Sequence, residues 1–231
     1  MKKILIASDL HARPDESLRT ERFILFLRSE ASTADRLYLL GDIFEFGFVF
    51  RGRILPAYQS LVDAICNLID KGVKVFFLAG NHDIWMNEYL RIKGLRIITE
   101  DDVQMLYGRK VQFFHGILSE QDGLSKLASQ IMKNPDAVWL YSRIPSSIGF
   151  GLALRLARIS RKRNPAFALK FSVNRLKPVA ADAEIVVSGH HHYPCEFIYD
   201  GVEYYIAGDW INQLTYLEMR QDGVVLRRYY S

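Results

Sequence analysis

The chain has 231 residues, a formal net charge of +4, 49% hydrophobic residues and 24% charged residues. This composition is typical of a folded globular protein and excludes a disordered or low-complexity chain. No stretch of the sequence approaches the roughly 20 consecutive apolar residues of a membrane span. The length allows one sizeable α/β core with room for an inserted subdomain. Two cysteines, Cys66 and Cys195, suggest no disulfide framework, so we expect both to be reduced and the compartment to be the cytosol.

Five short apolar runs of buried-strand character recur along the chain, and each ends in polar side chains. The runs cover residues 3–7, 37–40, 73–79, 111–114 and 185–187. Residues 17–30 and 58–69, which lie between the first three runs, carry apolar residues at helical spacing. Strands that alternate with helices of this length indicate an α/β sheet, and ligands of such sheets gather beyond the carboxyl ends of the strands.

The last fifth of the chain has the pattern of two hairpins. Asp200-Gly201 separates the apolar runs 197–199 and 202–206, and Asp222-Gly223 separates 214–219 from 224–230. Asp-Gly suits the positive backbone angles of tight hairpin turns. We therefore expect antiparallel strands beside the ligand-bearing strands, in a two-sheet α/β sandwich with one metal cleft at its edge.

The polar groups at the strand ends form a set of oxygen and nitrogen donors. They are Asp9, His11, Asp42, Asn81, His115, His190 and His192. Imidazole, carboxylate and amide donors without thiolate suit manganese, iron or zinc. Seven donors are too many for one ion but fit two metals that share a carboxylate. Two metals roughly 3.5–4 Å apart can hold a phosphate, generate hydroxide at neutral pH and stabilise both entering and leaving oxygens. The sequence therefore predicts two divalent metal ions, with manganese as the expected ion.

Each of these motifs is weak by itself, and only their combination is informative. Asp-x-His is common, and Gly-Asp after a strand is often only a turn. All six histidines of the chain, however, lie at these strand ends. Histidines that served only the core or the surface would not collect in this way, so the pattern favours a metal centre.

The combination of these motifs resembles that of a known family. The order Asp9-x-His11, Gly41-Asp42, Gly80-Asn81-His82-Asp83, His115-Gly116 and Gly189-His190-x-His192 is similar to that of the calcineurin-like metallophosphoesterase superfamily over nearly the whole chain. The resemblance implies a four-layer αββα sandwich formed by residues 1–231 as a single domain. It also implies that this fold belongs to a metal-dependent phosphoesterase, a hydrolase.

The resemblance further implies a role for each donor. Asp42 would bridge the two metals. One metal would be held by Asp9, His11 and His192, and the other by Asn81, His115 and His190. His82 would act catalytically on the leaving-group oxygen or on the developing charge, with Asp83 orienting its imidazole. An imidazole beside a metal ligand can protonate or hydrogen-bond such an oxygen.

Residues 117–178 interrupt the series of strands, and we expect an inserted basic helical cap there. No acidic residue lies between Asp136 and Asp182, and this interval holds nine basic ones, so the rest of the chain is net acidic. Arg155, Arg158 and Lys162 lie at helical spacing on an apolar stretch. Such a helix is typical of one that lies on an anionic membrane surface or holds an amphiphilic anion. The alternative is a helical pair that packs its apolar side on the core and leaves its arginines in water.

An aromatic stripe follows Asp42 directly. Phe44, Phe46, Phe48 and Phe50 alternate along the sequence and would share one face of an extended chain. The stripe could line a channel for an acyl chain or fill the rim of the core.

Together with the cap, Gly41-Asp42-Ile43-Phe44-Glu45 and Gly80-Asn81-His82-Asp83 resemble the UDP-2,3-diacylglucosamine diphosphatase branch of the superfamily, the peripheral membrane enzymes of lipid A synthesis. The resemblance implies hydrolysis of the pyrophosphate bond of this UDP-sugar lipid to UMP and 2,3-diacylglucosamine 1-phosphate (lipid X), at the cytoplasmic face of the membrane. The substrate contacts that it implies are Asn81, His82, Asp122, Arg158, Ser160, Asn164, Lys170 and His190.

Two other functions remain open. One is a phosphoesterase of the same fold that acts on another phospholipid, a nucleotide or a nucleic-acid phosphodiester, with the basic segment on the phosphate backbone. We do not expect nucleic acid as the partner, and the sequence indicates no protein partner. The other is a non-catalytic scaffold, which the complete set of seven donors argues against.

Overall fold

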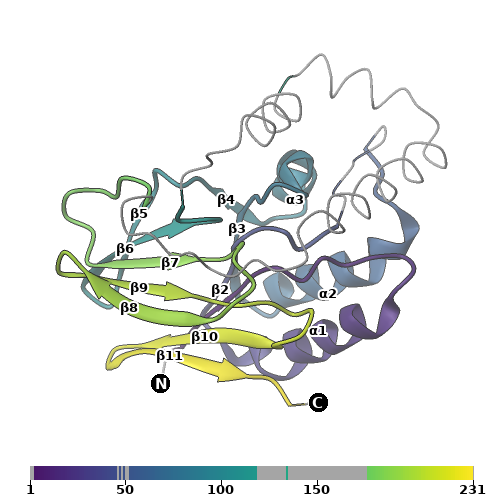
Figure 1. Cartoon of the computed structure of the whole chain (residues 1–231). Coiled ribbons are helices and arrows are strands. Elements are labelled where there is room, and N and C mark those ends of the chain that lie inside the picture. The colour runs from purple at the N-terminus through teal and green to yellow at the C-terminus, as the bar shows by residue number, and fades with distance from the viewer. Residues whose placement is uncertain are drawn as a thin grey trace.

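The structure is a computed structural model that describes residues 3–45, 47, 49, 52–118, 134 and 176–230. Two β-sheets face each other, and the helices α1, α2 and α3 lie beside the first of them (Figure 1). The first sheet has the strand order β11-β10-β1-β2-β3-β4, and the second has the order β5-β6-β7-β9-β8. Among the described residues, no helix has the length and apolar character needed to cross a lipid bilayer.

In the first sheet, β1 to β4 run parallel and alternate with helices, whereas β10 is antiparallel to β1 and β11 is antiparallel to β10. Its strands are β1 (Ile4–Ala7), β2 (Arg36–Leu39), β3 (Lys74–Leu78), β4 (Arg96–Ile98), β10 (Thr215–Arg220) and β11 (Gly223–Arg228). The chain crosses between them through α1 (Ser17–Ser29), α2 (Gln59–Asp70) and α3 (Asn87–Ile92). Single 3₁₀ turns lie at Ala31–Thr33, Pro56–Tyr58 and Ile84–Met86. Ala7 of β1 pairs with Leu39 of β2, so these two strands end at the same level of the sheet.

The second sheet brings the other ligand-bearing strands to the same edge. It consists of β5 (Val103–Leu106), β6 (Arg109–Phe114), β7 (Ile185–Ser188), β8 (Cys195–Tyr199) and β9 (Val202–Ile206). β7 runs parallel to both β6 and β9. Phe114, Ser188 and Ile206 lie side by side at the carboxyl ends of the three strands.

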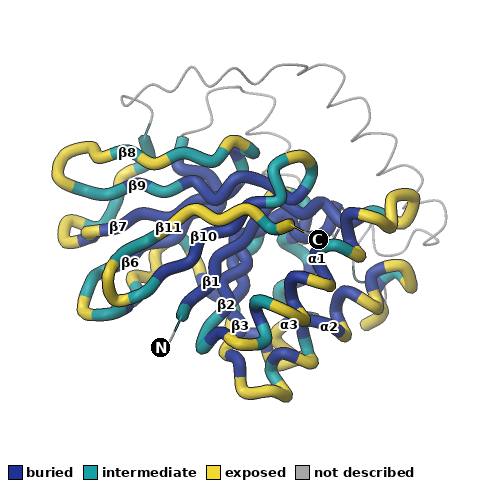
Figure 2. Tube along the Cα trace, turned by 90° about the horizontal axis from the view of Figure 1, so that it is seen from below, coloured by how far each residue is buried: buried dark blue, intermediate teal, exposed yellow. Residues whose placement is uncertain are grey.

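Hydrophobic side chains fill the space between the sheets and beneath the helices. Between the sheets, the Tyr38 ring stacks on Phe76 and on Phe113, with 4.4 Å between ring centroids in each pair. Under α1, Trp210 packs against Phe23 and Phe26 at 4.7 and 4.8 Å. Figure 2 shows buried residues concentrated along β1, β2 and β3. The residues of β11 and β8, at sheet edges, are partly or fully exposed.

The five predicted strands, the helices predicted at 17–30 and 58–69 and the two hairpins are confirmed, with one difference at the C-terminus. β10 lies antiparallel to β1 as expected, but β9 lies parallel to its ligand-bearing neighbour β7. The reason is that the chain reverses twice after β7, once before β8 and once in the Asp200-Gly201 turn, which restores its direction. The short elements α3, β4 and β5 were not expected from the sequence.

The predicted cap at 117–178 lies almost entirely outside the described residues. The structure does describe both ends of this segment. The Lys177 backbone N–H donates to the Ile117 carbonyl at 2.8 Å, and Leu118 forms a β-bridge with Leu176. The segment therefore leaves and rejoins the second sheet at one place, beside the end of β6.

Candidate metal centre

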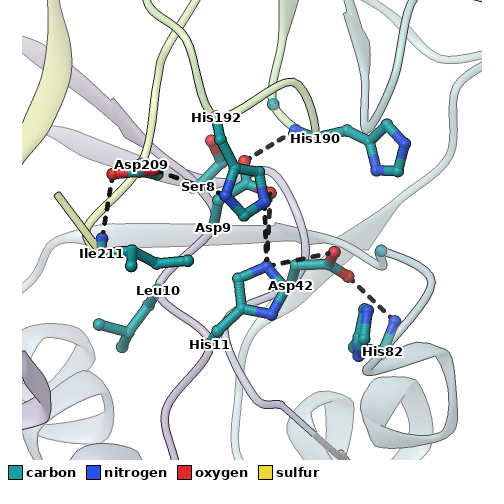
Figure 3. Close-up of polar contacts among 12 residues, drawn as sticks. Ser8, Asp9, Leu10, His11, Asp42, His82, His190, His192, Asp209 and Ile211 are labelled. Carbon is teal, nitrogen blue, oxygen red and sulfur yellow. Dashed lines mark hydrogen bonds and ion pairs between the residues drawn. The ribbon is translucent and has the colours of Figure 1, made fainter. Parts of the chain in front are cut away.

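The predicted donors of the described chain meet where the strands end. Asp9 and His11 follow β1, Asp42 follows β2, and His115 follows β6 directly. His190 and His192 follow β7. Figure 3 shows Asp9, His11, Asp42, His190 and His192 gathered around one region, with His82 beside them. The carboxyl ends of both sheets thus contribute to a single site.

The backbone at these donors adopts an uncommon conformation. Five of the predicted ligands have positive φ angles: Asp9 +56°, His11 +49°, Asp42 +53°, His190 +69° and His192 +55°. Residues other than glycine rarely adopt this region, and each such residue costs on the order of 1–3 kcal/mol. Backbone hydrogen bonds hold the strained loops: Asp9 N–H donates to Gly41 at 3.1 Å, and His11 N–H donates to Asp42 at 2.8 Å. Asp9 and His11 therefore do not lie on an extended chain, although their side chains converge.

The first group of donors is Asp9, His11 and His192, whose ligand atoms lie within 4.8 Å of one another. The Nε2 atoms of the two imidazoles are 3.3 Å apart. Oδ1 of Asp9 lies 3.4 Å from Nε2 of His192 and 3.9 Å from Nε2 of His11. In the described chain this buried Oδ1 has no hydrogen-bond partner. A buried carboxylate oxygen without a donor, facing two ring nitrogens, fits the position of a cation.

The second group is Asp42, His115 and His190. Nε2 of His115 lies 3.3 Å from Oδ2 of Asp42 and 3.1 Å from Nδ1 of His190. Oδ2 of Asp42 is also 3.6 Å from Nε2 of His11 in the first group. Asp42 therefore lies between the two groups, where a carboxylate shared by two ions would have to be.

The charges around Asp42 shift the pKa values of the second group in different directions. Burial tends to raise the pKa of Asp42, but His115 and His82 outweigh it and hold this pKa well below its usual range. Burial tends to lower the pKa of His115, but the Asp42 carboxylate outweighs it and raises this pKa to about 10. Burial, together with the neighbouring His115, holds the pKa of His190 well below its usual value. The neutral imidazole is the form that binds metals.

The loop after β3 places Asn81 and His82 next to these groups. Asn81 is exposed in this turn, and its role as a ligand remains a prediction. The His82 backbone N–H donates to Oδ1 of Asp42 at 3.0 Å, and Nδ1 of its ring lies 2.9 Å from the Glu45 carbonyl. The His82 ring is 5.0 Å from the His11 ring, in an edge-to-face arrangement.

Asp83 has a different set of contacts from the one expected. Its Oδ2 accepts hydrogen bonds from the backbone N–H groups of Ile43 at 2.7 Å and Phe44 at 3.3 Å. Its Oδ1 accepts one from Gly80 at 2.8 Å. Burial raises the pKa of this carboxyl to about 6, and the nearby Asp42 adds to the shift. Asp83 therefore ties the loop after β2 to the loop after β3, and its carboxylate faces the backbone instead of the His82 ring.

Two glycines allow these loops to approach each other. A Cβ atom on Gly80 would overlap the Asp42 side chain, and one on Gly41 would lie 2.6 Å from Nδ1 of His115. Gly41 also has a φ of +80°, which only glycine adopts without strain. The donor geometry thus depends on the absence of side chains at both positions.

Sequence reasoning assigned no role to two buried acidic residues of the site. Oε2 of Glu45 lies 3.1 Å from Nδ1 of His11, and Oδ2 of Asp209 lies 3.5 Å from Nδ1 of His192. Glu45 belongs to the Gly41–Glu45 motif, and Asp209 follows the end of β9. The signal that could have identified Asp209 is the one that identified the ligands, a polar group just after an apolar strand.

Several predicted residues lie outside the part of the chain that the structure describes. The substrate-binding candidates among them are Asp122, Arg158, Ser160, Asn164 and Lys170. Of the aromatic stripe, only Phe44 is described. Its ring is buried 5.2 Å from that of Tyr58, so Phe44 is a core residue.

Comparisons with known proteins give one consistent family. The family model described as calcineurin-like phosphoesterase matches residues 2–194. A protein named UDP-2,3-diacylglucosamine hydrolase from Stenotrophomonas maltophilia is 32% identical over 96% of this chain and 96% of its own length. A protein of the same name from Salmonella arizonae is 29% identical over 96% and 97%.

Solved structures share the fold. The E. coli phosphoesterase Yfce superposes with a TM-score of 0.52 at 16% identity, over 98% of this chain and 92% of its own. A protein described as a novel archaeal phosphodiesterase superposes with a TM-score of 0.50 at 15% identity, over 97% and 98%. The family match covers β1 to β7 and all the predicted donors, the last of which is His192, and the two donor groups could each hold a metal ion. The chain therefore belongs to the calcineurin-like phosphoesterase family and is a metal-dependent phosphoesterase.

Proposed function

We propose that this protein hydrolyses the pyrophosphate bond of UDP-2,3-diacylglucosamine, giving UMP and 2,3-diacylglucosamine 1-phosphate, and so serves lipid A biosynthesis. The observation that carries the proposal is the similarity to two proteins named UDP-2,3-diacylglucosamine hydrolase, which are 32% and 29% identical to this chain over 96% of its length. The two donor groups on either side of Asp42 support the chemistry.

The residues that would hold two divalent ions are the predicted ones. Asp9, His11 and His192 would hold one ion, with Asn81, His115 and His190 on the other and Asp42 shared. Manganese suits these donors, as do iron and zinc. When bound, such ions attract phosphate oxygens and lower the pKa of water at the site.

His82 is suited to donate a proton to the leaving group. The Glu45 carbonyl can only accept a hydrogen bond, so Nδ1 of His82, 2.9 Å away, carries a proton. When the ring is protonated, Nε2 carries a second proton that it can transfer to the departing phosphate oxygen. The oxygen of a water molecule forms the new bond to the α-phosphorus, the bond from that phosphorus to the bridging oxygen breaks, and the sugar 1-phosphate leaves with the bridging oxygen.

The proposal is tested by comparing turnover of UDP-2,3-diacylglucosamine with that of bis(p-nitrophenyl) phosphate, with added manganese and with or without detergent. We expect much faster release of UMP from the lipid, with a dependence on detergent. Equal rates on the two substrates would contradict the proposed substrate. In water enriched in heavy oxygen, the label should appear in UMP, whereas label in the sugar phosphate would place the attack on the β-phosphorus.

Asp42→Asn should reduce turnover by more than about 100-fold, since changes of residues behind the ligands already cost 10- to 100-fold in metal-dependent enzymes. The amide retains the size of the side chain, so circular dichroism should show a folded protein. Wild-type turnover of Asp42→Asn at saturating manganese would contradict the role of the donor groups.

We also propose that the segment between Asp136 and Asp182, which contains no acidic residue, binds an anionic membrane surface. This binding would place the protein peripherally on the cytoplasmic side. The nine basic residues of the segment support this, because each contributes about 1 kcal/mol of attraction near such a surface. Sedimentation with anionic vesicles, but not with zwitterionic ones, is the expected result. Salt-dependent binding to DNA without vesicle binding would favour a nucleic-acid phosphodiester as substrate instead.

A further inference from the structure

Within the described part of the chain, the two histidines of the first donor group share a feature that His115 of the second group lacks. Behind each of them, on the side away from Asp9, lies a buried carboxylate: Glu45 behind His11 and Asp209 behind His192. In the second group, His115 has a backbone carbonyl in that place, since its Nδ1 lies 2.8 Å from the Leu40 oxygen. Glu45 lies within a motif that resembles the family, whereas Asp209 lies beyond residues 2–194, which the family model matches.

The two oxygens of Asp209 have separate contacts. Oδ1 accepts the backbone N–H groups of Ile211, Asn212 and Gln213 at 3.1, 2.8 and 2.9 Å. Oδ2 points to Nδ1 of His192 at 3.5 Å, as Figure 3 shows. The three N–H groups hold the carboxylate in one orientation, and its side chain is only 3% exposed. The turn after β9 therefore fixes the position of Oδ2.

The segment that carries Asp209 is also bonded to the segment that carries Asp9. The Trp210 backbone N–H donates to the Asp9 carbonyl at 3.1 Å, and the Ser8 hydroxyl donates to the Gly208 carbonyl at 3.3 Å. Asp209, Asp9 and His192 thus come from three segments that hold one another in place. A carboxylate fixed in this way can orient the imidazole of His192, whose side chain is 38% exposed.

We propose that Asp209 is a positioning residue for the metal site: it accepts the Nδ1 proton of His192 and so leaves the lone pair of Nε2 directed at Asp9. A neutral imidazole carries its proton on one nitrogen only, and the nitrogen without the proton is the one that can bind a metal. Histidine ligands commonly donate their other N–H to a carboxylate, which fixes both the tautomer and the ring orientation. The proposal concerns metal binding and does not depend on the identity of the substrate.

Asp209→Asn separates this role from that of holding the turn. The amide oxygen of asparagine can still accept the three backbone N–H groups, while its NH₂ group takes the place of Oδ2. Since NH₂ can only donate, it favours the tautomer in which Nδ1 of His192 accepts and Nε2 carries the proton. That tautomer cannot bind a metal through Nε2.

The experiment measures manganese binding to the metal-free protein by calorimetry, together with thermal unfolding. One manganese equivalent should bind about 10- to 100-fold more weakly to Asp209→Asn. Asp102→Asn is the matched control, because Oδ2 of Asp102 also accepts a backbone N–H, that of Thr99 at 2.7 Å, in an exposed turn without a histidine. The control should bind manganese like the wild type. Wild-type affinity for both equivalents in Asp209→Asn would overturn the proposal.

Nitrogen NMR of the unmodified chain, loaded with zinc, keeps the proposal testable should Asp209→Asn fail to fold. His192 should show a proton on Nδ1 and none on Nε2, and the reverse pattern would overturn the proposal. Neither measurement uses the substrate. If metal binding follows these expectations but UDP-2,3-diacylglucosamine is not hydrolysed, the proposed function fails while the role of Asp209 stands.

Discussion

At the scale of single residues, the site combines strained backbone with very close packing. Asp9, Asp42 and His192 have positive φ angles, and their side chains point to one place. The surrounding backbone hydrogen bonds offset the conformational cost of these angles. Residues held in this way cluster at functional sites, because only a well-determined structure maintains them. The positions around them should therefore tolerate little change.

Gly80→Ala should disturb the site more than it disturbs the fold. The added methyl group would overlap the Asp42 carboxylate, so we expect a loss of about 1–3 kcal/mol in the free energy of unfolding and weaker manganese binding. Gly108→Ala is the control: its φ is +82° and nothing lies within 4 Å of the added atom. That substitution should cost about 1–2 kcal/mol from backbone strain alone and leave manganese affinity unchanged. Equal manganese affinity in both variants would contradict the contact at Gly80.

At the scale of elements, β7 is held between β6 and β9, and an ion pair spans the three strands. The Arg109 guanidinium of β6 donates to both oxygens of Glu203 in β9, at 2.9 and 3.2 Å. The hydrogen bond from Arg109 holds the pKa of Glu203 below its usual value of 4.5, against the opposing effect of burial. This bidentate contact joins β6 to β9 near the amino-terminal ends of the two strands, at the opposite end of the sheet from His115 and His190.

Glu203→Gln should lower the free energy of unfolding by less than about 1 kcal/mol at neutral pH, because the pair is partly exposed to solvent. The pKa of Glu203 is lower in the folded than in the unfolded state, so its contribution is complete above pH 4.5 and disappears as the pH falls through the folded-state value. Urea unfolding at a series of pH values measures this. The difference between the variant and the wild type should vanish in acid.

Glu88→Gln is the control for that measurement. It removes an exposed ion pair with Arg91 within a single helix and should have a smaller effect, below about 0.5 kcal/mol. A pH-independent difference between Glu203→Gln and the wild type would show that the stabilisation does not come from the charge of the carboxylate.

At the scale of the whole molecule, the interface between the sheets depends on aromatic packing in its interior and on the metal site at its edge. Tyr38 lies between Phe76 of the same sheet and Phe113 of the other. Tyr38→Ala should lower the free energy of unfolding by about 3–5 kcal/mol, as expected for a buried aromatic residue. Tyr38→Phe retains the ring and should cost less than about 1.5 kcal/mol. Similar losses in the two variants in chemical denaturation would contradict the importance of the stack.

The donors come from both sheets, so a bound metal should also stabilise the fold. Asp9 and Asp42 follow strands of the first sheet, and His115 and His190 follow strands of the second. Manganese at about 100 times its dissociation constant should add about 2.7 kcal/mol of stability. Chelation should therefore lower the melting temperature, and added manganese should restore it. Asp42→Asn should respond much less, and a wild-type protein indifferent to chelation would contradict a site shared between the sheets.

The sequence by itself determined the α/β class, the main strands and helices, and the chemical nature of the donors. Local patterns were sufficient because buried strands appear as apolar runs and Asp-Gly marks tight turns. The short elements α3, β4 and β5 were missed because they contain too few residues for a periodic signal. The roles of ligands such as Asn81 and of the segment 117–178 remain predictions.

The family resemblance implied which donors would share a metal, and only the tertiary structure decided how they come to face one another. His190 and His192 both have positive φ angles, and their side chains belong to different donor groups although the residues are only two apart. Glu45 reaches His11, and Asp209 reaches His192, across segments that are distant in sequence. These contacts depend on the packing of two sheets whose strands end at one edge, and no local pattern of residues encodes that arrangement.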